Sequence, residues 1–142
     1  MHHTLAVRLL LPAFVLSSAG CATRPVSNAD ARSAPAAQVI DASYLKAGAG
    51  SGRVTVKRDS GIGGSACSSR VFVDAKPVAD LNTSEKIIIY LLPGDHVLSA
   101  WPNGACGGGM SEVRATIREG GDLSFRIGYG SNGDFSINAT AF

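Results

Sequence analysis

The sequence is poor in charge and in aromatic side chains. Of its 142 residues only 17% are charged and 6% aromatic, and 13 basic residues nearly balance 11 acidic ones. So small a basic excess argues against a dedicated nucleic-acid binder, which carries a strongly basic face. The length allows one domain and argues against a separate cofactor-binding lobe. A hydrophobic content of 45% argues against a disordered chain.

Near its start the chain has one apolar run, residues 9–16, which follows Arg8 and precedes the small residues 17–20. The run is too short for a membrane-spanning helix, which needs about 20 apolar residues. Residues 1–20 are therefore predicted to be an export signal that is removed. The segment Ser18-Ala19-Gly20-Cys21 resembles the lipobox of bacterial lipoproteins, in which small residues precede an invariant cysteine.

This resemblance implies that Cys21 is acylated, becomes the mature N-terminus and makes the membrane a partner through its acyl chains. Several acyl chains anchor a protein stably, whereas one does so only marginally. In such lipoproteins the residue after the cysteine influences sorting, and Ala22 implies the outer membrane. We expect the anchored domain to face the periplasm. The alternative is an ordinary secretory signal with an incidental cysteine.

Cysteine is scarce, with three in all, so two remain once Cys21 carries lipid. In an oxidising compartment Cys67 and Cys106 are predicted to form one disulfide. It would close a loop of about 40 residues and stabilise the domain by about 4 kcal/mol. Cys67 as a nucleophile, and a zinc site that adds His96, are less favoured alternatives because the motif spacings do not match. We expect no catalytic residue, metal or cofactor.

Residues 21–52 are rich in Ala, Ser, Gly and Pro and are predicted to be a lipidated N-terminus and a flexible linker. A short helix over residues 36–45 is an option, because Ile40 and Tyr44 lie four apart.

The remaining residues, 53–142, form the predicted domain. Apolar residues there alternate with polar ones, which is typical of half-buried strands. The expected strands cover residues 54–56, 71–73, 86–92, 96–101, 113–117, 123–127 and 135–139. The fold class is therefore predicted to be all-β, a small antiparallel β-sandwich of about seven strands.

Two hairpins are predicted. Pro93-Gly94-Asp95 would join strand 86–92 to strand 96–101, and residues 119–121 would join 113–117 to 123–127. The second hairpin places Arg118 opposite Asp122.

The same register places Arg114 opposite Arg126. Two guanidinium groups on one solvent-exposed face suggest an anion-binding site, which Lys57 and Arg58 would join if their strand lay alongside. The alternative is that both arginines are simply solvated.

Residues 71–79 and 91–98 resemble PEGA-type β-sandwich modules of bacterial envelope proteins. The shared features are a strand that ends in Val73-Asp74, a short hairpin, and a later Pro93-Gly94-x-His96 step, with Ala75 where the family prefers glycine. The resemblance implies a binding or envelope-associated role without catalytic residues. Residues 128–133 match G-x-G-x-x-G, but no helix follows, so we interpret them as a hairpin connection.

The sequence thus predicts an envelope lipoprotein whose domain is a non-catalytic binding or structural module. Its partner would be an envelope glycan or an envelope protein, and nucleic acid is not expected. Two alternatives stay open: an inhibitor or immunity protein against a wall-attacking enzyme, and a small Cys-dependent cell-wall enzyme.

Overall fold

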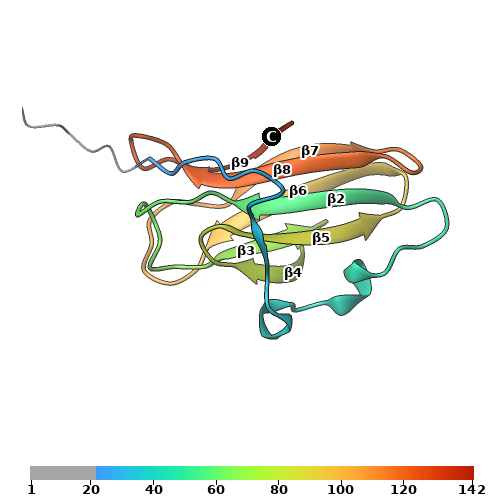
Figure 1. Ribbon diagram of the computed structural model, residues 1–142, viewed down its shortest axis with the longest axis horizontal. Helices are drawn as coiled ribbons and strands as arrows, with labels where there is room; N and C mark the ends of the chain where they lie inside the picture. Colours follow the sequence, from blue (N-terminus) through green and yellow to red (C-terminus); the bar gives the residue numbers. More distant parts are fainter. Residues whose placement is uncertain (1–21) are drawn as a thin grey trace, which may run out of the picture.

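The computed structural model describes residues 22–142, which form two β-sheets packed face to face (Figure 1). The strands are β1 (Arg32–Ser33), β2 (Gly52–Arg58), β3 (Ser69–Val73), β4 (Lys76–Leu81), β5 (Glu85–Leu91), β6 (Gly94–Pro102), β7 (Ser111–Ile117), β8 (Asp122–Tyr129) and β9 (Phe135–Ala139). The five-stranded sheet has the order β1-β5-β2-β8-β9 and the four-stranded sheet the order β4-β3-β6-β7. The predicted all-β sandwich is confirmed, with two strands, β1 and β4, beyond the expected seven.

Most strand pairs are antiparallel, but two pairs in the five-stranded sheet are parallel. β1 runs parallel to β5, and β2 runs parallel to β8 with Val54 opposite Leu123. Parallel partners require a crossover connection. The segment of chain that connects β2 to β8 contains β5 and all four strands of the other sheet.

The core lies between the two sheets and consists of the alternating apolar side chains that the sequence indicates. Fully or nearly fully buried members are Val54, Val56, Val71, Val73, Leu81, Ile89, Leu98, Ala115, Ile117, Phe125, Ile127 and Ile137. The period-two pattern therefore identified the inward faces correctly.

Both predicted hairpins are wrong. β5 pairs with β2 while β6 pairs with β3 and β7, so the chain crosses from one sheet to the other at Pro93. Likewise β7 pairs with β6, and β8 pairs with β2 and β9. Residues 118–121 likewise form an arch, a turn that crosses from one sheet to the other. In it the Gly121 amide donates to the Arg118 carbonyl at 2.9 Å. Pro-Gly and Gly-Gly turns suit an arch as well as a hairpin, since both need a sharp reversal.

The segment predicted to be a flexible linker instead lies along the sandwich. Its backbone pairs with β5 through β1, where the Ala34 amide donates to the Lys86 carbonyl at 2.8 Å. Farther on, the Ile40 amide donates to the Val78 carbonyl of β4, also at 2.8 Å. The segment thus covers neighbouring edges of both sheets, and the backbone groups of an exposed edge strand otherwise invite aggregation.

The suggested helix over residues 36–45 is also different in the structure. Two separate 3₁₀ turns occupy the region, η1 (Ala36–Gln38) and η2 (Ala42–Leu45). Val39 and Tyr44 are partly buried against the core, whereas Ile40 is 46% exposed. Spacing by four residues did not predict the inward face, because the chain between the turns is extended.

Candidate functional site

Of the predicted site residues, Cys21 lies outside the described part of the chain, whereas both other cysteines lie within it. Cys67 and Cys106 form the predicted disulfide, with a sulfur–sulfur distance of 2.02 Å. It joins the loop between β2 and β3 to the loop between β6 and β7. A sulfur in a disulfide has no thiolate to offer, so Cys67 is not a nucleophile in this state.

The structure does not bring Arg114 and Arg126 together, so the anion site predicted from their pairing is wrong. Arg114 lies on β7 in the four-stranded sheet and makes an exposed ion pair with Asp95 at 3.6 Å. Arg126 lies on β8 in the other sheet and binds Asp59. Because β7 and β8 belong to different sheets, the two guanidinium groups share no face.

Asp59 is fully buried and is the centre of a polar cluster that sequence reasoning missed. Its carboxylate accepts hydrogen bonds from Arg126 Nε, at 3.2 Å to each oxygen, and from Thr23 Oγ1 at 3.2 Å. Gly128 lies against it, and a Cβ there would come within 2.4 Å of Asp59 Oδ2. The first glycine of the G-x-G-x-x-G match is thus explained by packing, and residues 130–134 connect β8 to β9 as expected.

Lys57 and Arg58, which the sequence offered as members of an anion site, are buried. The Arg58 guanidinium donates to the carbonyl oxygens of Gly64 (2.5 Å), Leu81 (3.1 Å) and Cys67. Lys57 donates to the Phe142 carbonyl and lies 5.3 Å from the centre of its ring. Both cations therefore hold loops and chain ends in place and face no open anion site.

Asp74 and His96 link residues 71–79 to residues 91–98. Asp74 Oδ2 lies 2.7 Å from His96 Nδ1, and Asp74 Oδ1 accepts from the Val97 amide at 2.9 Å. Burial lowers the pKa of His96, but the hydrogen bonds to Asp74 and to the Leu92 carbonyl outweigh it, so the pKa is raised. The pair ties the β3–β4 turn to the start of β6.

The outer face of the four-stranded sheet carries Trp101, the single tryptophan of the sequence, which is 44% exposed. Its cross-strand neighbour on β3 is Arg70, whose guanidinium binds both oxygens of Asp80 at 2.9 Å. Asn103 Nδ2 donates to the same carboxylate at 2.9 Å. Hydrogen bonds from Arg70, opposed by partial burial, lower the pKa of Asp80, so the network stays charged. An exposed aromatic beside a fixed arginine is typical of binding surfaces.

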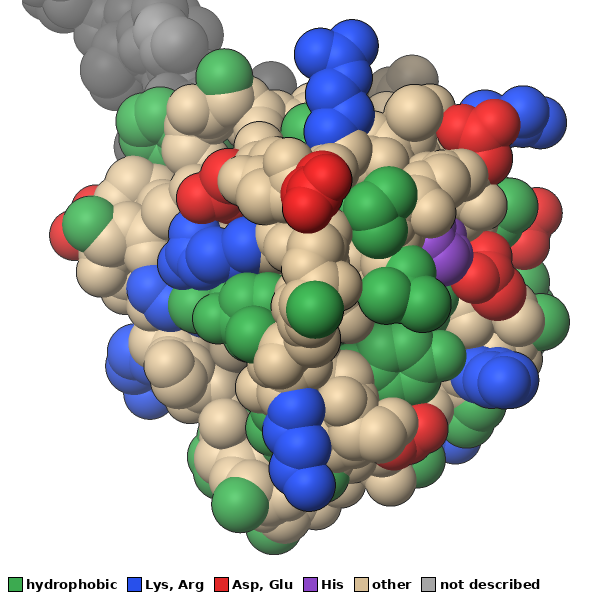
Figure 2. Space-filling model, turned by 90° about the vertical axis from the view of Figure 1, so that its right-hand side faces the viewer, with side chains coloured by type: hydrophobic (Ala, Val, Ile, Leu, Met, Phe, Trp, Pro, Cys, Tyr) green, Lys and Arg blue, Asp and Glu red, His purple; other side chains and the backbone are tan. Residues whose placement is uncertain are grey.

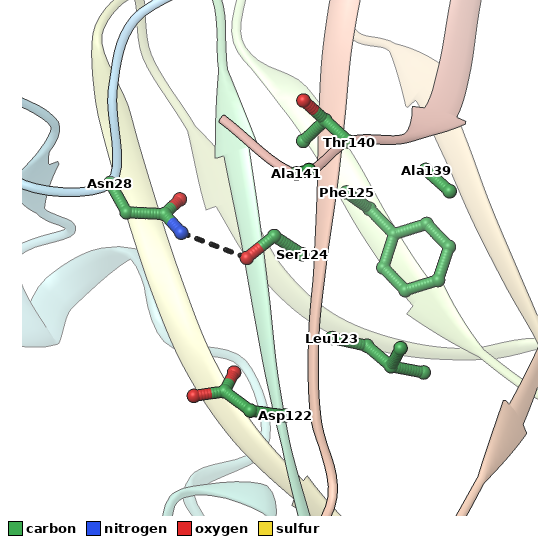
Figure 3. Close-up of a pocket in the computed structure, with 8 residues that line it drawn as sticks. All are labelled: Asn28, Asp122, Leu123, Ser124, Phe125, Ala139, Thr140 and Ala141. Carbon is green, nitrogen blue, oxygen red and sulfur yellow. Dashed lines mark hydrogen bonds between the residues drawn. The ribbon is translucent and has the colours of Figure 1, made fainter.

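A shallow cavity of about 530 Å³ lies over β8 (Figure 3). Asn28 faces Ser124 across it, with the amide Nδ2 donating to the hydroxyl at 2.9 Å. Among the described residues that line it, the only charged one is Asp122, which already pairs with Arg53 at 2.8 Å. The cavity offers no pair of groups suited to acid–base or nucleophilic chemistry.

A larger cavity of about 1010 Å³ lies at the end of the sandwich where the described chain begins. Its lining includes Ala22, Arg24, Ile62, Cys106 and Tyr129, together with several glycines. Gly64 packs on the Tyr129 ring so closely that a Cβ would lie 2.2 Å from it. Backbone and apolar groups predominate here, so the cavity is suited to contact rather than to catalysis.

Within residues 22–142 no group of three or more potential metal ligands converges. In the same part of the chain, no helix has both the length and the hydrophobicity that crossing a membrane requires. No protein-family model matches the chain, and no curated protein matches its sequence.

Proposed function

We propose that the protein is an envelope lipoprotein, anchored in the outer membrane by acyl chains on Cys21. Its domain, which resembles PEGA modules, would be a non-catalytic binding or structural module in the periplasm. The observation that carries the proposal is the order of the chain: an apolar run, a lipobox-like segment, and a folded body that begins directly after Cys21. The Cys67–Cys106 disulfide supports an oxidising compartment.

The anchor is tested by mass spectrometry of the N-terminal peptide and by incorporation of labelled palmitate. We expect the wild-type chain to begin at Cys21 with acyl groups attached, and the Cys21→Ser variant to carry none. An unmodified Cys21 at an otherwise cleaved N-terminus would refute the proposal and leave an ordinary secreted protein.

For the binding role, the face around Trp101 is the best-supported surface. Arg70 is held rigid there by Asp80, so a partner that contacts Trp101 and Arg70 would pay little conformational entropy. In a pull-down assay, sacculi or immobilised envelope extracts should bind the wild-type protein, and they should bind the Trp101→Ala variant much more weakly. Leu92→Ala, which removes an exposed side chain at another place, is the matched control.

A further inference from the structure

The described part of the chain begins at one end of the sandwich, where hydrogen bonds hold Thr23 and Arg24 in place. The Thr23 amide donates to the Tyr129 carbonyl at 2.9 Å, and Arg24 pairs with Ser60 through two backbone hydrogen bonds of 2.7 and 2.9 Å. Thr23 Oγ1 also binds buried Asp59 at 3.2 Å. Cys21 is one peptide bond before Ala22, about 3.8 Å between Cα atoms. No free tether therefore separates the predicted acylation site from the folded body.

The loops around this entry point carry few charges. They comprise residues 22–24, 60–68, 82–84, 103–110 and 130–134, in which Arg24 and Asp134 are the only charged residues. Charged side chains flank these loops, since the exposed Arg32 guanidinium donates to the Thr83 carbonyl at 3.4 Å and Asn103 donates to Asp80 at 2.9 Å. Two large apolar side chains are exposed there: Ile62, at 92%, and Met110, at 46%. The loops that follow β2 and β8 lie at this same end in Figure 1.

The opposite end is also flanked by charged residues. Its turns and flanking positions carry Arg53, Asp74, Lys76, Asp95, Arg118, Glu119 and Asp122. Figure 2 shows this end, where acidic and basic side chains surround a group of hydrophobic ones. Leu92 is 65% exposed here, so the presence of an exposed apolar residue does not by itself distinguish the two ends. The start of the described chain does, because Thr23 and Arg24 are hydrogen-bonded to Tyr129 and Ser60 at the end that carries Ile62.

We propose that the end of the sandwich around Ile62 lies directly on the lipid surface, which fixes the orientation of the domain. This inference rests on the proposed acylation of Cys21. The acyl chains would bring Ile62 to the boundary of headgroups and hydrocarbon, where an apolar side chain is favourable. Arg24 would place its guanidinium among the lipid phosphates.

The test uses full-length, lipidated protein in vesicles of phosphatidylethanolamine and phosphatidylglycerol. In a Trp101→Phe background, Ile62→Trp and Leu92→Trp each place one tryptophan at one end of the sandwich. Lipids brominated near the headgroup quench tryptophans that touch the bilayer. We expect the Trp at 62 to lose most of its emission and to shift to the blue, and the Trp at 92 to be unaffected.

Flotation of the same vesicles reports separately on the anchor. Protein that floats with both tryptophans unquenched, or with the Trp at 92 quenched instead, overturns the proposed orientation and leaves the anchor intact. Protein that does not float, with Cys21 unmodified, overturns the proposed function.

A second measurement needs no substitution. In the unaltered chain, hydrogen exchange of residues 60–66 should slow on vesicles relative to detergent, while that of residues 92–95 should not change. Equal exchange of residues 60–66 in both conditions also refutes the orientation.

Discussion

Ala75 is expected to be a residue whose replacement by glycine stabilises the protein. It occupies the second central position of the β3–β4 turn with φ of +66°, next to Asp74 with φ of +48°. Two positive φ values in a two-residue loop define a type I′ hairpin, which favours glycine. The side chain of Ala75 is exposed and so contributes little packing that would be lost.

The magnitude follows from two opposing contributions. A left-handed conformation costs an L-residue about 1–2 kcal/mol. Glycine is freer in the unfolded chain, which offsets about 0.5–1 kcal/mol of the gain. Ala75→Gly should therefore raise the free energy of unfolding by about 0.5–1 kcal/mol, or Tm by about 2–5 °C for a domain of this size.

Urea titration and thermal melts under oxidising conditions measure the change. Ala47→Gly is the matched control, because Ala47 is also exposed but does not have a positive φ. That variant should be neutral or slightly destabilised. If Ala75→Gly matched the control or fell below the wild type, the strain attributed to this turn would be refuted.

Three further outcomes are expected. Replacing Cys67 and Cys106 by alanine should lower the free energy of unfolding by about 4 kcal/mol, and reductant should destabilise the wild type but not the variant. Arg126→Ser should cost about 3–5 kcal/mol in urea titrations, since it strands a buried carboxylate, whereas Arg114→Ser should change stability by less than about 0.5 kcal/mol. The pKa of His96 is raised in the folded state, so protonated His96 stabilises the fold. This contribution to the free energy of unfolding is complete below about pH 6.5 and is lost as the pH rises through the folded-state pKa. The urea concentration at the midpoint of unfolding should thus decrease as the pH is raised from mildly acidic to mildly alkaline. The His96→Asn variant should show a weaker dependence on pH.

The sequence was sufficient to predict seven of the nine strands and their buried faces, but not β1, β4 or the way the strands pair. Alternation in residues 113–117 and 123–127 shows which side chains point inward, and both sheets point inward to one core. Nothing in a period of two tells which sheet a strand joins. The arch at residues 118–121 and a hairpin loop use the same glycines, so turn composition did not resolve the choice.

The site was predictable where chemistry is tied to residue type. Two cysteines in a chain expected to be exported predicted the disulfide, whereas Asp59 gave no signal because its partners, Thr23 and Arg126, are far away in sequence. The segment before β2 has the composition of a linker, and yet it is ordered. Its contacts with the sandwich are made largely by backbone amides and carbonyls. Composition does not report on such hydrogen bonds.

The parallel pairing of β2 with β8 has a consequence for how the chain reaches its native state. Arg53 and Asp122 are partners in the sheet although 69 positions separate them in the chain. Contacts of such long range slow folding, because loop-closure entropy must be lost before they form. A chain shortened before residue 122 would lack β8 and would leave one long edge of β2 open to other chains.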